Sequence, residues 1–287
     1  MTIDIESATP NNVLDRASLV LDAFDGPGRL TLAQIVRRTG LPRSSAHRLL
    51  DRLVALKWLR RHEHDYELGI RLMELGSIAV HQDRLHRAAM PYLHELHRAT
   101  GFVVHLAILD GADVVYLEKI GGALGEAIPT RVGGRQPAHC TAVGKAILAC
   151  RDSSSAVDTQ TPLPRKTRYS IATHAALHAE LQKVRALNIA YEREESVPKI
   201  GCVAAPIGDV DDAIAAVSVC GRSDRMNFDY QLAAPVRMTA LSIWRSLDSG
   251  SARVAPTLQR PQRLRPNGLR TQARTAPISP RPSELIS

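Results

Sequence analysis

The sequence predicts an α+β protein in which a winged helix-turn-helix and a mixed α/β domain follow one another along the chain. Two observations lead to this prediction. Apolar residues recur at helical spacing through residues 12–56, and a short basic hairpin follows them. From residue 102 the apolar period changes to that of β-strands. The chain has 287 residues, so each part is long enough to bury its own core.

The N-terminal part is expected to contain three helices and a hairpin. Apolar residues at helical steps place the first helix over 13–24, and the Asp-Gly-Pro-Gly run after it ends that helix. A second, short helix is expected over 31–40, with a threonine cap at its start and a glycine at its end. The third covers 42–56, because proline suits a first helical turn. Residues 58–68 are predicted to form the hairpin.

Charge is segregated within this part of the chain. Residues 1–28 hold five acids and one arginine, whereas residues 29–61 hold nine lysines and arginines and one acid. A local basic field of this kind is typical of phosphate binding. The total net charge of +8 is weaker support, because residues 249–287 hold seven arginines and one acid.

The third helix and the hairpin are the predicted DNA contacts. One face of the helix is apolar and packs, while the other carries donors that can enter the major groove of double-stranded DNA. Arginines of the hairpin, the wing, would meet the backbone or the minor groove. Two other interpretations stay open, a solvated basic face and a winged helix that binds protein. The predicted DNA-binding residues are Arg43, Ser44, Ser45, His47, Arg48, Arg52, Arg60 and Arg61.

The second part begins with a helical segment over 69–99, which is expected to break or restart near Pro91. Strand pairs that alternate with helices then predict a mixed α/β domain. After Asp248 the tail is rich in proline, arginine, serine and threonine and is expected to be disordered. The elements expected between are strands over 102–109, 113–120, 189–193, 202–207 and 213–220, and helices over 141–150, 175–187 and 230–247.

Several classes of protein are disfavoured by composition. The N-terminus lacks the apolar core of a secretory signal, and no apolar run is long enough to cross a membrane. Four scattered cysteines show neither zinc-finger spacing nor the density of a disulfide scaffold, which favours reduced thiols in the cytoplasm. The glycines at 121–125 and 133–134 lack nucleotide-binding fingerprints, so no cofactor is expected. No metal is expected either, because the cysteine spacing is not that of a metal site.

Four ordered segments resemble the IclR family of bacterial regulators. They are LTLAQIVRRTGLPRSSAHRLLDRLVALKWL, YELGIRLMELGS, AHCTAVGKAILA and the set EE, GCVAAPIGDV and AAVSVCG. The resemblance implies a winged helix-turn-helix, a linker helix and a GAF-like domain that binds a small effector. It also implies a homodimer or a dimer of dimers. The first helix and the linker helix are candidate partner surfaces, and packing of the same apolar stripes inside the domain is the alternative.

This resemblance divides the chain and gives its expected function. We expect a regulator of transcription, not an enzyme, whose operator binding or activation is modulated by an organic acid of a catabolic pathway. The operator is expected to be palindromic. The expected parts are a leader (1–11), the DNA-binding domain (12–68), the linker helix (69–88), the effector domain (89–248) and a basic tail (249–287).

The family pattern also implies an effector site. Backbone amides at a helix start suit a carboxylate, and small residues on later strands leave room for a ligand. The sequence departs from the pattern at Asn188, Lys199, Asp212, Cys220 and Arg222, which leaves the effector open. The implied effector-binding residues are Ala142, Val143, Gly144, Glu192, Ile200, Cys202, Ser218 and Cys220.

Other functions remain open at this stage. The second domain could serve only to dimerise a constitutive DNA-binding protein. Cys140 beside His139 could belong to a Cys/His enzyme, although neighbours in sequence do not normally face each other. The cysteines and His139 could hold zinc if the fold gathers them. The basic tail is either an accessory nucleic-acid contact or an inert extension.

Overall fold

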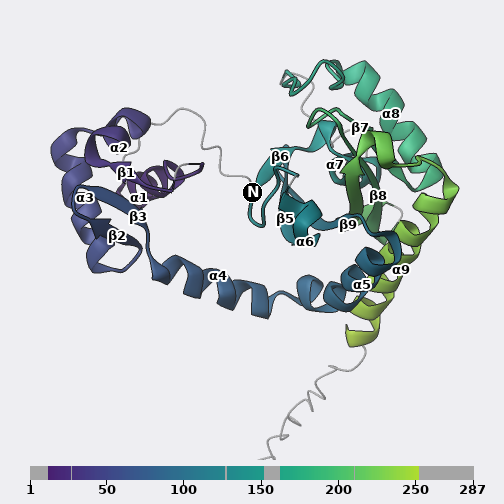
Figure 1. Cartoon of the computed structure of the whole chain (residues 1–287), viewed down its shortest axis with the longest axis horizontal. Helices are drawn as coiled ribbons and strands as arrows, with labels where there is room; N and C mark the ends of the chain where they lie inside the picture. The colour runs from purple at the N-terminus through teal and green to yellow at the C-terminus, as the bar shows by residue number, and fades with distance from the viewer. Residues whose placement is uncertain (1–11, 27, 127, 152–161, 210, 252–287) are drawn as a thin grey trace, which may run out of the picture.

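In a computed structural model of the chain, the described residues are 12–26, 28–126, 128–151, 162–209 and 211–251. They form a small N-terminal domain and a larger C-terminal domain, with an exposed helix between them (Figure 1). The α+β class is therefore confirmed. The expectations for residues 1–11 and 252–287 lie outside the described residues.

The N-terminal domain has the predicted order of helices and hairpin. Asn12 caps the first helix by accepting from Asp15 N at 2.8 Å, and Thr31 with Gln34 forms a capping box on the second. A two-residue strand that was not predicted adds to the hairpin, giving the sheet order β1-β3-β2. The elements are α1 (Val13–Asp22), β1 (Leu30–Thr31), α2 (Leu32–Thr39), α3 (Arg43–Ala55), β2 (Leu59–His62) and β3 (Asp65–Leu68).

Residues that the apolar periodicity selects form the core of this domain. Val20 of α1, Ile35 of α2 and Leu50 of α3 are fully buried, and Leu59 and Tyr66 of the hairpin close the cluster. Because each helix contributes one apolar face, the opposite face of α3 is left for solvent or a partner.

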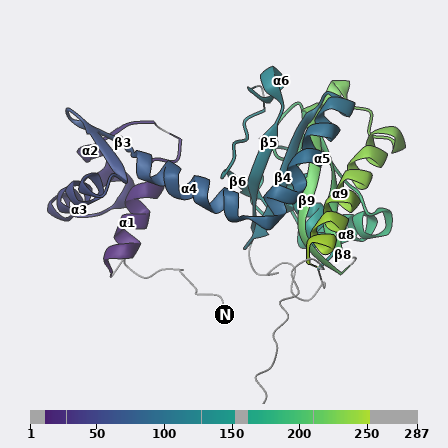
Figure 2. The same cartoon turned by 90° about the horizontal axis from the view of Figure 1, so that it is seen from below.

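The connecting segment differs from the sequence prediction. The expected break near Pro91 is wrong, because helix α4 (Ile70–Gln82) ends at Asp83 and helix α5 (Arg84–Thr100) begins directly after it. The Asp83 backbone is extended, and its side chain accepts from His86 N at 2.6 Å to cap α5. Pro91 lies on the exposed side of α5. No residue of α4 is buried, and it spans the space between the domains (Figure 2).

The C-terminal domain is built on an antiparallel sheet of order β6-β5-β4-β9-β8-β7. Helices α5 and α9 cover one face, and α7 and α8 lie on the other. The final helix reaches Ser251, so it enters the segment expected to be tail. The strands are β4 (Val103–Asp110), β5 (Asp113–Ile120), β6 (Arg135–Pro137), β7 (Ala190–Arg193), β8 (Ile200–Asp209) and β9 (Asp212–Arg222), and the helices are α6 (Gly122–Glu126), α7 (Ala142–Ala149), α8 (His174–Leu187) and α9 (Tyr230–Ser251).

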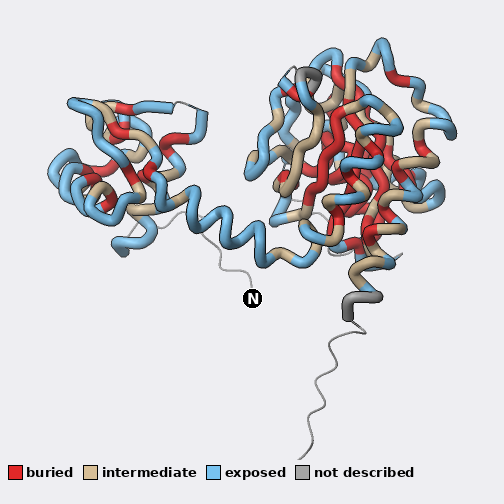
Figure 3. Tube along the Cα trace, turned by 60° about the horizontal axis from the view of Figure 1, so that its bottom comes forward, coloured by how far each residue is buried: buried red, intermediate tan, exposed pale blue. Residues whose placement is uncertain are grey.

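The sheet separates two apolar clusters, which appear as the buried interior of this domain in Figure 3. Val104, Leu106 and Val219 face α5 and α9. The alternate residues of the same strands, among them Ala107 and Ala216, face α7. Large side chains therefore fill the first face and small ones the second, which brings α7 close to the sheet.

The glycine-rich segment after β5 contains elements that were not predicted. Helix α6 and strand β6 lie within it, and neither has an apolar period long enough to recognise. Two of the departures from the family pattern sit in left-handed backbone, Asn188 at φ 50° and Lys199 at φ 64°. Glycine adopts this conformation most easily, which explains why the family pattern has glycine at these two positions.

The close approach of α7 depends on Gly144. A Cβ at this position would overlap the backbone carbonyl of Ala138, in the 3₁₀ helix η1 (Ala138–Cys140). We expect Gly144→Ala to lower the free energy of unfolding by ~1–3 kcal/mol, the usual cost of overpacking. Urea titration followed by circular dichroism measures this loss.

Gly28→Ala in the exposed segment before β1 is the matched control, because no atom lies within 4 Å of its Cβ position. It is expected to raise the free energy of unfolding by up to ~1 kcal/mol, because alanine has less conformational freedom than glycine in the unfolded chain. Equal effects of the two substitutions would contradict the packing argument.

Candidate DNA-binding surface and effector site

Helix α3 presents the predicted recognition residues on its free face. Ala46, Leu50 and Leu53 are buried in the domain core, while Arg43, Ser44, His47, Arg48 and Arg52 are exposed and Ser45 is half-buried. Four of them, together with Leu32, line a shallow hollow beside the start of the helix. The structure therefore brings the predicted residues of α3 together on one surface.

The charges of this surface are available to a partner. His47 Nδ1 lies 3.1 Å from Asp51 Oδ2, whereas the structure, over the residues it describes, records no ion pair for Arg43, Arg48 or Arg52. Pro42 provides no side-chain cap, so the first N–H groups of α3 remain open. An uncapped helix start beside arginines suits a phosphate.

The wing arginines are partly engaged within the wing. Glu67 accepts from Arg60 Nε at 2.6 Å and from Arg29 Nε at 2.8 Å, and these hydrogen bonds lower the pKa of its carboxyl to about 2. Arg61 Nε donates to the Glu63 carbonyl at 3.0 Å, and its guanidinium lies 5.7 Å from the Tyr66 ring centroid. Both arginines are exposed, but they are held by neighbours in a way that sequence spacing did not reveal.

The effector residues predicted on the strands share one face of the sheet (the effector face). Glu192 of β7 lies opposite Cys202 of β8, Cys202 lies opposite Cys220 of β9, and Cys220 lies opposite Val103 of β4. Residues directly opposite each other point to the same side of a sheet. Ser218 lies two residues from Cys220 and so faces the same way. Ile200 packs beside Val103 and Cys220 at the end of this face.

Helix α7 covers this face and completes the site. Its first residues, Ala142, Val143 and Gly144, are all buried. The Thr141 hydroxyl accepts from Gly144 N at 3.1 Å, which satisfies one of the free N–H groups of the first turn. The N–H groups of Ala142 and Val143 have no acceptor within the helix, because they lie in its first turn.

Glu192 is held firmly at one end of the row of residues that runs across strands β7, β8 and β9. Its Oε1 accepts from the backbone N–H groups of Glu195 at 2.6 Å and Ser196 at 3.1 Å, and its buried Oε2 has no hydrogen-bond partner among the described residues. Burial raises the pKa of this carboxyl to about 8. Glu192 is therefore largely protonated at neutral pH and can donate a hydrogen bond.

His105 is a residue of this site that the sequence analysis missed. It is buried on β4 opposite Ser218, and its Nε2 lies 2.8 Å from Thr130 Oγ1. Its Nδ1 is buried without a hydrogen-bond partner in the described part of the chain. The signal was present, because the histidine interrupts an otherwise apolar inward position of an alternating strand.

The segment with Thr130 closes over the sheet. Lys119 Nζ donates to the carbonyls of Ile128 at 2.8 Å and Thr130 at 2.5 Å, and it lies opposite His105 in the ladder. Burial lowers the pKa of this ammonium. The ammonium therefore ties the closing segment to β5.

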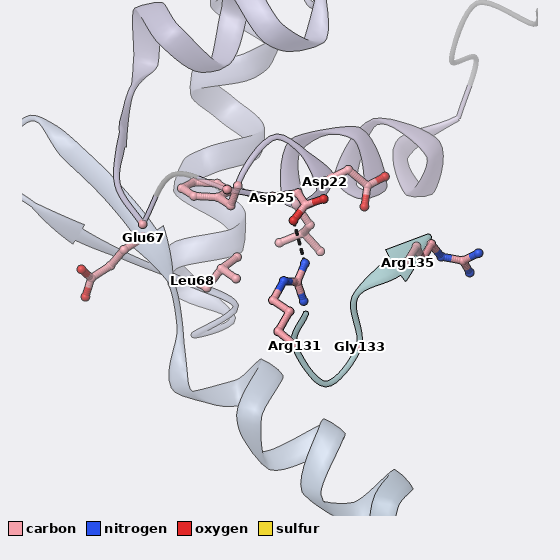
Figure 4. Close-up of a pocket in the computed structure, with 11 residues that line it drawn as sticks. Asp22, Asp25, Glu67, Leu68, Arg131, Gly133 and Arg135 are labelled. Carbon is pink, nitrogen blue, oxygen red and sulfur yellow. Dashed lines mark hydrogen bonds and ion pairs between the residues drawn. The ribbon is translucent and has the colours of Figure 1, made fainter. Parts of the chain in front are cut away.

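The same segment also reaches the other domain. Arg131 Nη2 lies 2.6 Å from Asp25 Oδ1, at the end of α1 (Figure 4). Around this ion pair is an open crevice, lined also by Asp22, Glu67 and Arg135. Thr130 at the effector face and Arg131 at the DNA-binding domain are thus adjacent residues.

The arrangement around Cys140 does not suit nucleophilic catalysis. His139 Nε2 lies 3.0 Å from the Pro164 carbonyl, and Cys140 Sγ donates to the Pro137 carbonyl at 3.3 Å. Burial raises the pKa of the Cys140 thiol to about 12, whereas a nucleophilic cysteine needs a lowered pKa. Each group therefore has its own backbone partner.

Two further findings concern the described residues only. They contain no group of three or more histidine, cysteine, aspartate or glutamate side chains placed to hold a metal ion. None of their helices has the length and apolar character that crossing a membrane requires.

Family profiles match both domains. Residues 13–63 match the profile of the IclR helix-turn-helix domain, and residues 77–245 match the profile described as bacterial transcriptional regulator IclR C-terminal. Together they cover most of the described chain.

Individual proteins give the same result. The HTH-type transcriptional regulator XynR of Escherichia coli is 32% identical over 226 residues, which is 77% of this chain and 89% of that protein. The Pca regulon regulatory protein of Pseudomonas putida is 31% identical over 209 residues, which is 71% of each chain. The crystal structure of an IclR homologue from Microbacterium hydrocarbonoxydans, complexed with 4-hydroxybenzoate, matches with a TM-score of 0.72 and 27% identity over 83% of this chain and 100% of that one.

The raised pKa of Glu192 makes stability depend on pH. The folded state favours the protonated form, so its contribution is present below the ordinary pKa of 4.5 and is lost as pH rises through about 8. We expect the free energy of unfolding of the wild type to fall over this range relative to that of Glu192→Gln, which cannot ionise. Urea titrations at several pH values measure the difference.

Glu194→Gln is the matched control for this measurement. Hydrogen bonds from Lys199 N and the Ser223 hydroxyl lower the pKa of the Glu194 carboxyl, so its effect on the free energy of unfolding is confined to acidic pH. If the free energy of unfolding of the wild type changes in parallel with that of Glu192→Gln between pH 4.5 and 8, the Glu192 carboxyl is not protonated in the folded state as argued.

Proposed function

The chain belongs to the IclR family of bacterial transcriptional regulators, and from this we propose that α3 reads the operator while the α7 face of the sheet binds a small carboxylate that controls it. The observation that carries the proposal is the pair of buried, unpartnered polar atoms at that face, His105 Nδ1 and Glu192 Oε2. Buried polar groups are normally hydrogen-bonded, so two such atoms on one face favour a ligand over a domain that only dimerises.

The DNA contacts follow from the surface of α3. Arg43 and Arg48 project from the first turns of an uncapped helix, and their guanidinium groups have the geometry to hold guanine or phosphate. Arg60 and Arg61 extend this basic surface onto the wing. Arg52 lies further along the same exposed face, where it suits a backbone phosphate.

We also propose that the protein acts as a homodimer that meets through α4 and α1. Helix α4 exposes apolar side chains along its length and α1 exposes two more at its start, although neither helix buries them in its own chain. A paired helix-turn-helix doubles the phosphate contacts and matches a palindromic site. The exposed residues are Val13, Leu14, Ile70, Met73, Leu75, Ile78 and Val80.

The effector is proposed to be a small organic acid with a second polar group. Its carboxylate would accept from the N–H groups of Ala142 and Val143 at the start of α7. The second group, a hydroxyl or a carbonyl, would meet His105 and the protonated Glu192. A bound hydroxybenzoate in one structurally similar protein and the Pca regulon of one relative are consistent with this class.

Communication between the sites is proposed to run through residues 130 and 131. A ligand acts only by binding two states of the protein differently. If an effector takes the hydrogen bond between His105 and Thr130, the next residue, Arg131, changes its hold on Asp25 of the DNA-binding domain.

The DNA-binding proposal is tested with Arg48→Ala. An operator is first selected from random duplexes with the wild-type protein, and the selected sites are expected to be inverted repeats. The substitution is expected to weaken binding to that operator by ~1–3 kcal/mol per protomer, the usual value of a base contact. Gel shift measures the affinity, and circular dichroism checks the fold.

Arg98→Ala removes the same charge from an exposed position on α5. It is expected to leave operator affinity nearly unchanged. If the two variants lose affinity equally, α3 does not read the operator in the way proposed.

The effector proposal is tested with matched acids and amides, beginning with 4-hydroxybenzoate and 4-hydroxybenzamide. Carboxylates that fit are expected to raise the melting temperature, and the rise grows with the logarithm of their affinity, whereas their amides are expected to leave it unchanged. Ala142→Pro removes one proposed donor at the first helical position, where proline is tolerated, and the extended backbone of Thr141 suits a following proline.

This variant is expected to bind the same carboxylate about tenfold more weakly, because a hydrogen bond to a charged group is lost. Equal binding of acid and amide would overturn the placement of the carboxylate. An unchanged affinity in folded Ala142→Pro would do the same.

A further inference from the structure

Two cysteines meet at the centre of the effector face. Cys202 and Cys220 are directly opposite each other in the β8–β9 ladder, and both are free thiols. Ser218 Oγ lies 3.6 Å from Cys220 Sγ, so a hydroxyl stands beside the pair. Cys202 is partly exposed and Cys220 is buried.

The ladder places these residues at a spacing that a disulfide can bridge. Opposite residues of an antiparallel pair have Cα atoms about 4.5 or 5.5 Å apart, depending on the type of pair. Both values fall in the range of about 4.4–6.8 Å found in disulfides. Because the two side chains project from the same face, the bridge needs rotation of the side chains rather than movement of the strands.

The surroundings also favour reaction at Cys220. Burial opposes ionisation of this thiol, but the hydrogen bond from Cys202 and the nearby imidazole of His105 outweigh it, so the pKa of Cys220 is lowered. The thiolate is the reactive form of cysteine. The other two cysteines differ, because burial raises the pKa of both Cys140 and Cys150.

We propose that Cys202 and Cys220 form a reversible disulfide when a hydroperoxide enters the effector site. The Cys220 thiolate attacks one peroxide oxygen and the O–O bond breaks. A sulfenic acid forms, and the leaving oxygen is protonated to an alcohol, or to water when the oxidant is hydrogen peroxide. The Cys202 sulfur then attacks the Cys220 sulfur, the S–O bond breaks, and the hydroxyl leaves as water with the proton of the Cys202 thiol. The peroxide is reduced, the two thiols are oxidised, and a dithiol reductant reverses the change.

The consequence concerns the regulation proposed above, on which this inference rests. The bridge removes two thiols that line the effector face and fixes their positions beside Glu192. The oxidised protein is expected to lose its response to the effector while α3 is unaltered. The effector site would then sense oxidant as well as ligand.

Peptide mapping tests the bridge directly. Trypsin cuts after Lys199 and Arg222, so Cys202 and Cys220 lie in one peptide, 200–222, whereas Cys140 and Cys150 lie in two others. The native full chain is treated with hydrogen peroxide, alkylated with iodoacetamide and digested. We expect peptide 200–222 to lose two hydrogens and to gain no alkyl group, and dithiothreitol treatment before alkylation to restore two alkyl groups.

Two variants sharpen this result. Cys220→Ser is expected to leave Cys202 as a thiol that alkylates after peroxide treatment, and Cys150→Ala is expected to bridge like the wild type. A wild-type peptide that remains doubly alkylated, or a Cys220 that advances to sulfinic acid without a bridge, would overturn the proposal.

The mapping needs neither operator nor effector. Failure of the bridge is therefore distinct from failure of the proposed function, which is judged by operator binding of the reduced protein. In the same samples, oxidised wild type is expected to keep its affinity for the selected operator, and loss of that affinity would contradict an effect confined to the effector face.

Discussion

The geometry of the proposed effector site depends on one buried cation. Lys145 of α7 has no exposed surface, and its ammonium lies 2.7 Å from Glu195 Oε1 and 3.4 Å from Glu180 Oε1. A buried charge is costly unless it is paired, so this ion pair fixes α7 against the turn that follows β7. The backbone N–H of Glu195 in turn holds Glu192. The start of α7 and the acidic end of the row are thereby held in one geometry.

Sequence patterns predicted the elements that have a long apolar period. The three N-terminal helices, the wing and the strands on either side of Asp110 all follow from side-chain spacing. The break in the connecting helix did not, because a proline on an exposed helix face is tolerated while Asp83 supplies a cap. Strands β1 and β6 have two and three residues, too few for any period to be recognised.

The site was predictable only in part, for a related reason. Glu192, Cys202 and Cys220 were found through a family pattern, and the ladder explains why they belong together, since they are consecutive partners across three strands. His105 and Thr130 come from distant segments that pair only in three dimensions. The contacts that hold the wing arginines also depend on strand register, which places Glu67 opposite Arg60.

The exposed helix between the domains has a consequence for folding. Helix α4 has thirteen residues and buries none of them in its own chain. An isolated helix of this length is marginal in water, because nucleation is costly and tertiary packing normally supplies most of the stability. In the proposed homodimer, a second chain would supply this packing. The helicity of α4, and with it the distance between the two DNA-binding domains, would then depend on protein concentration.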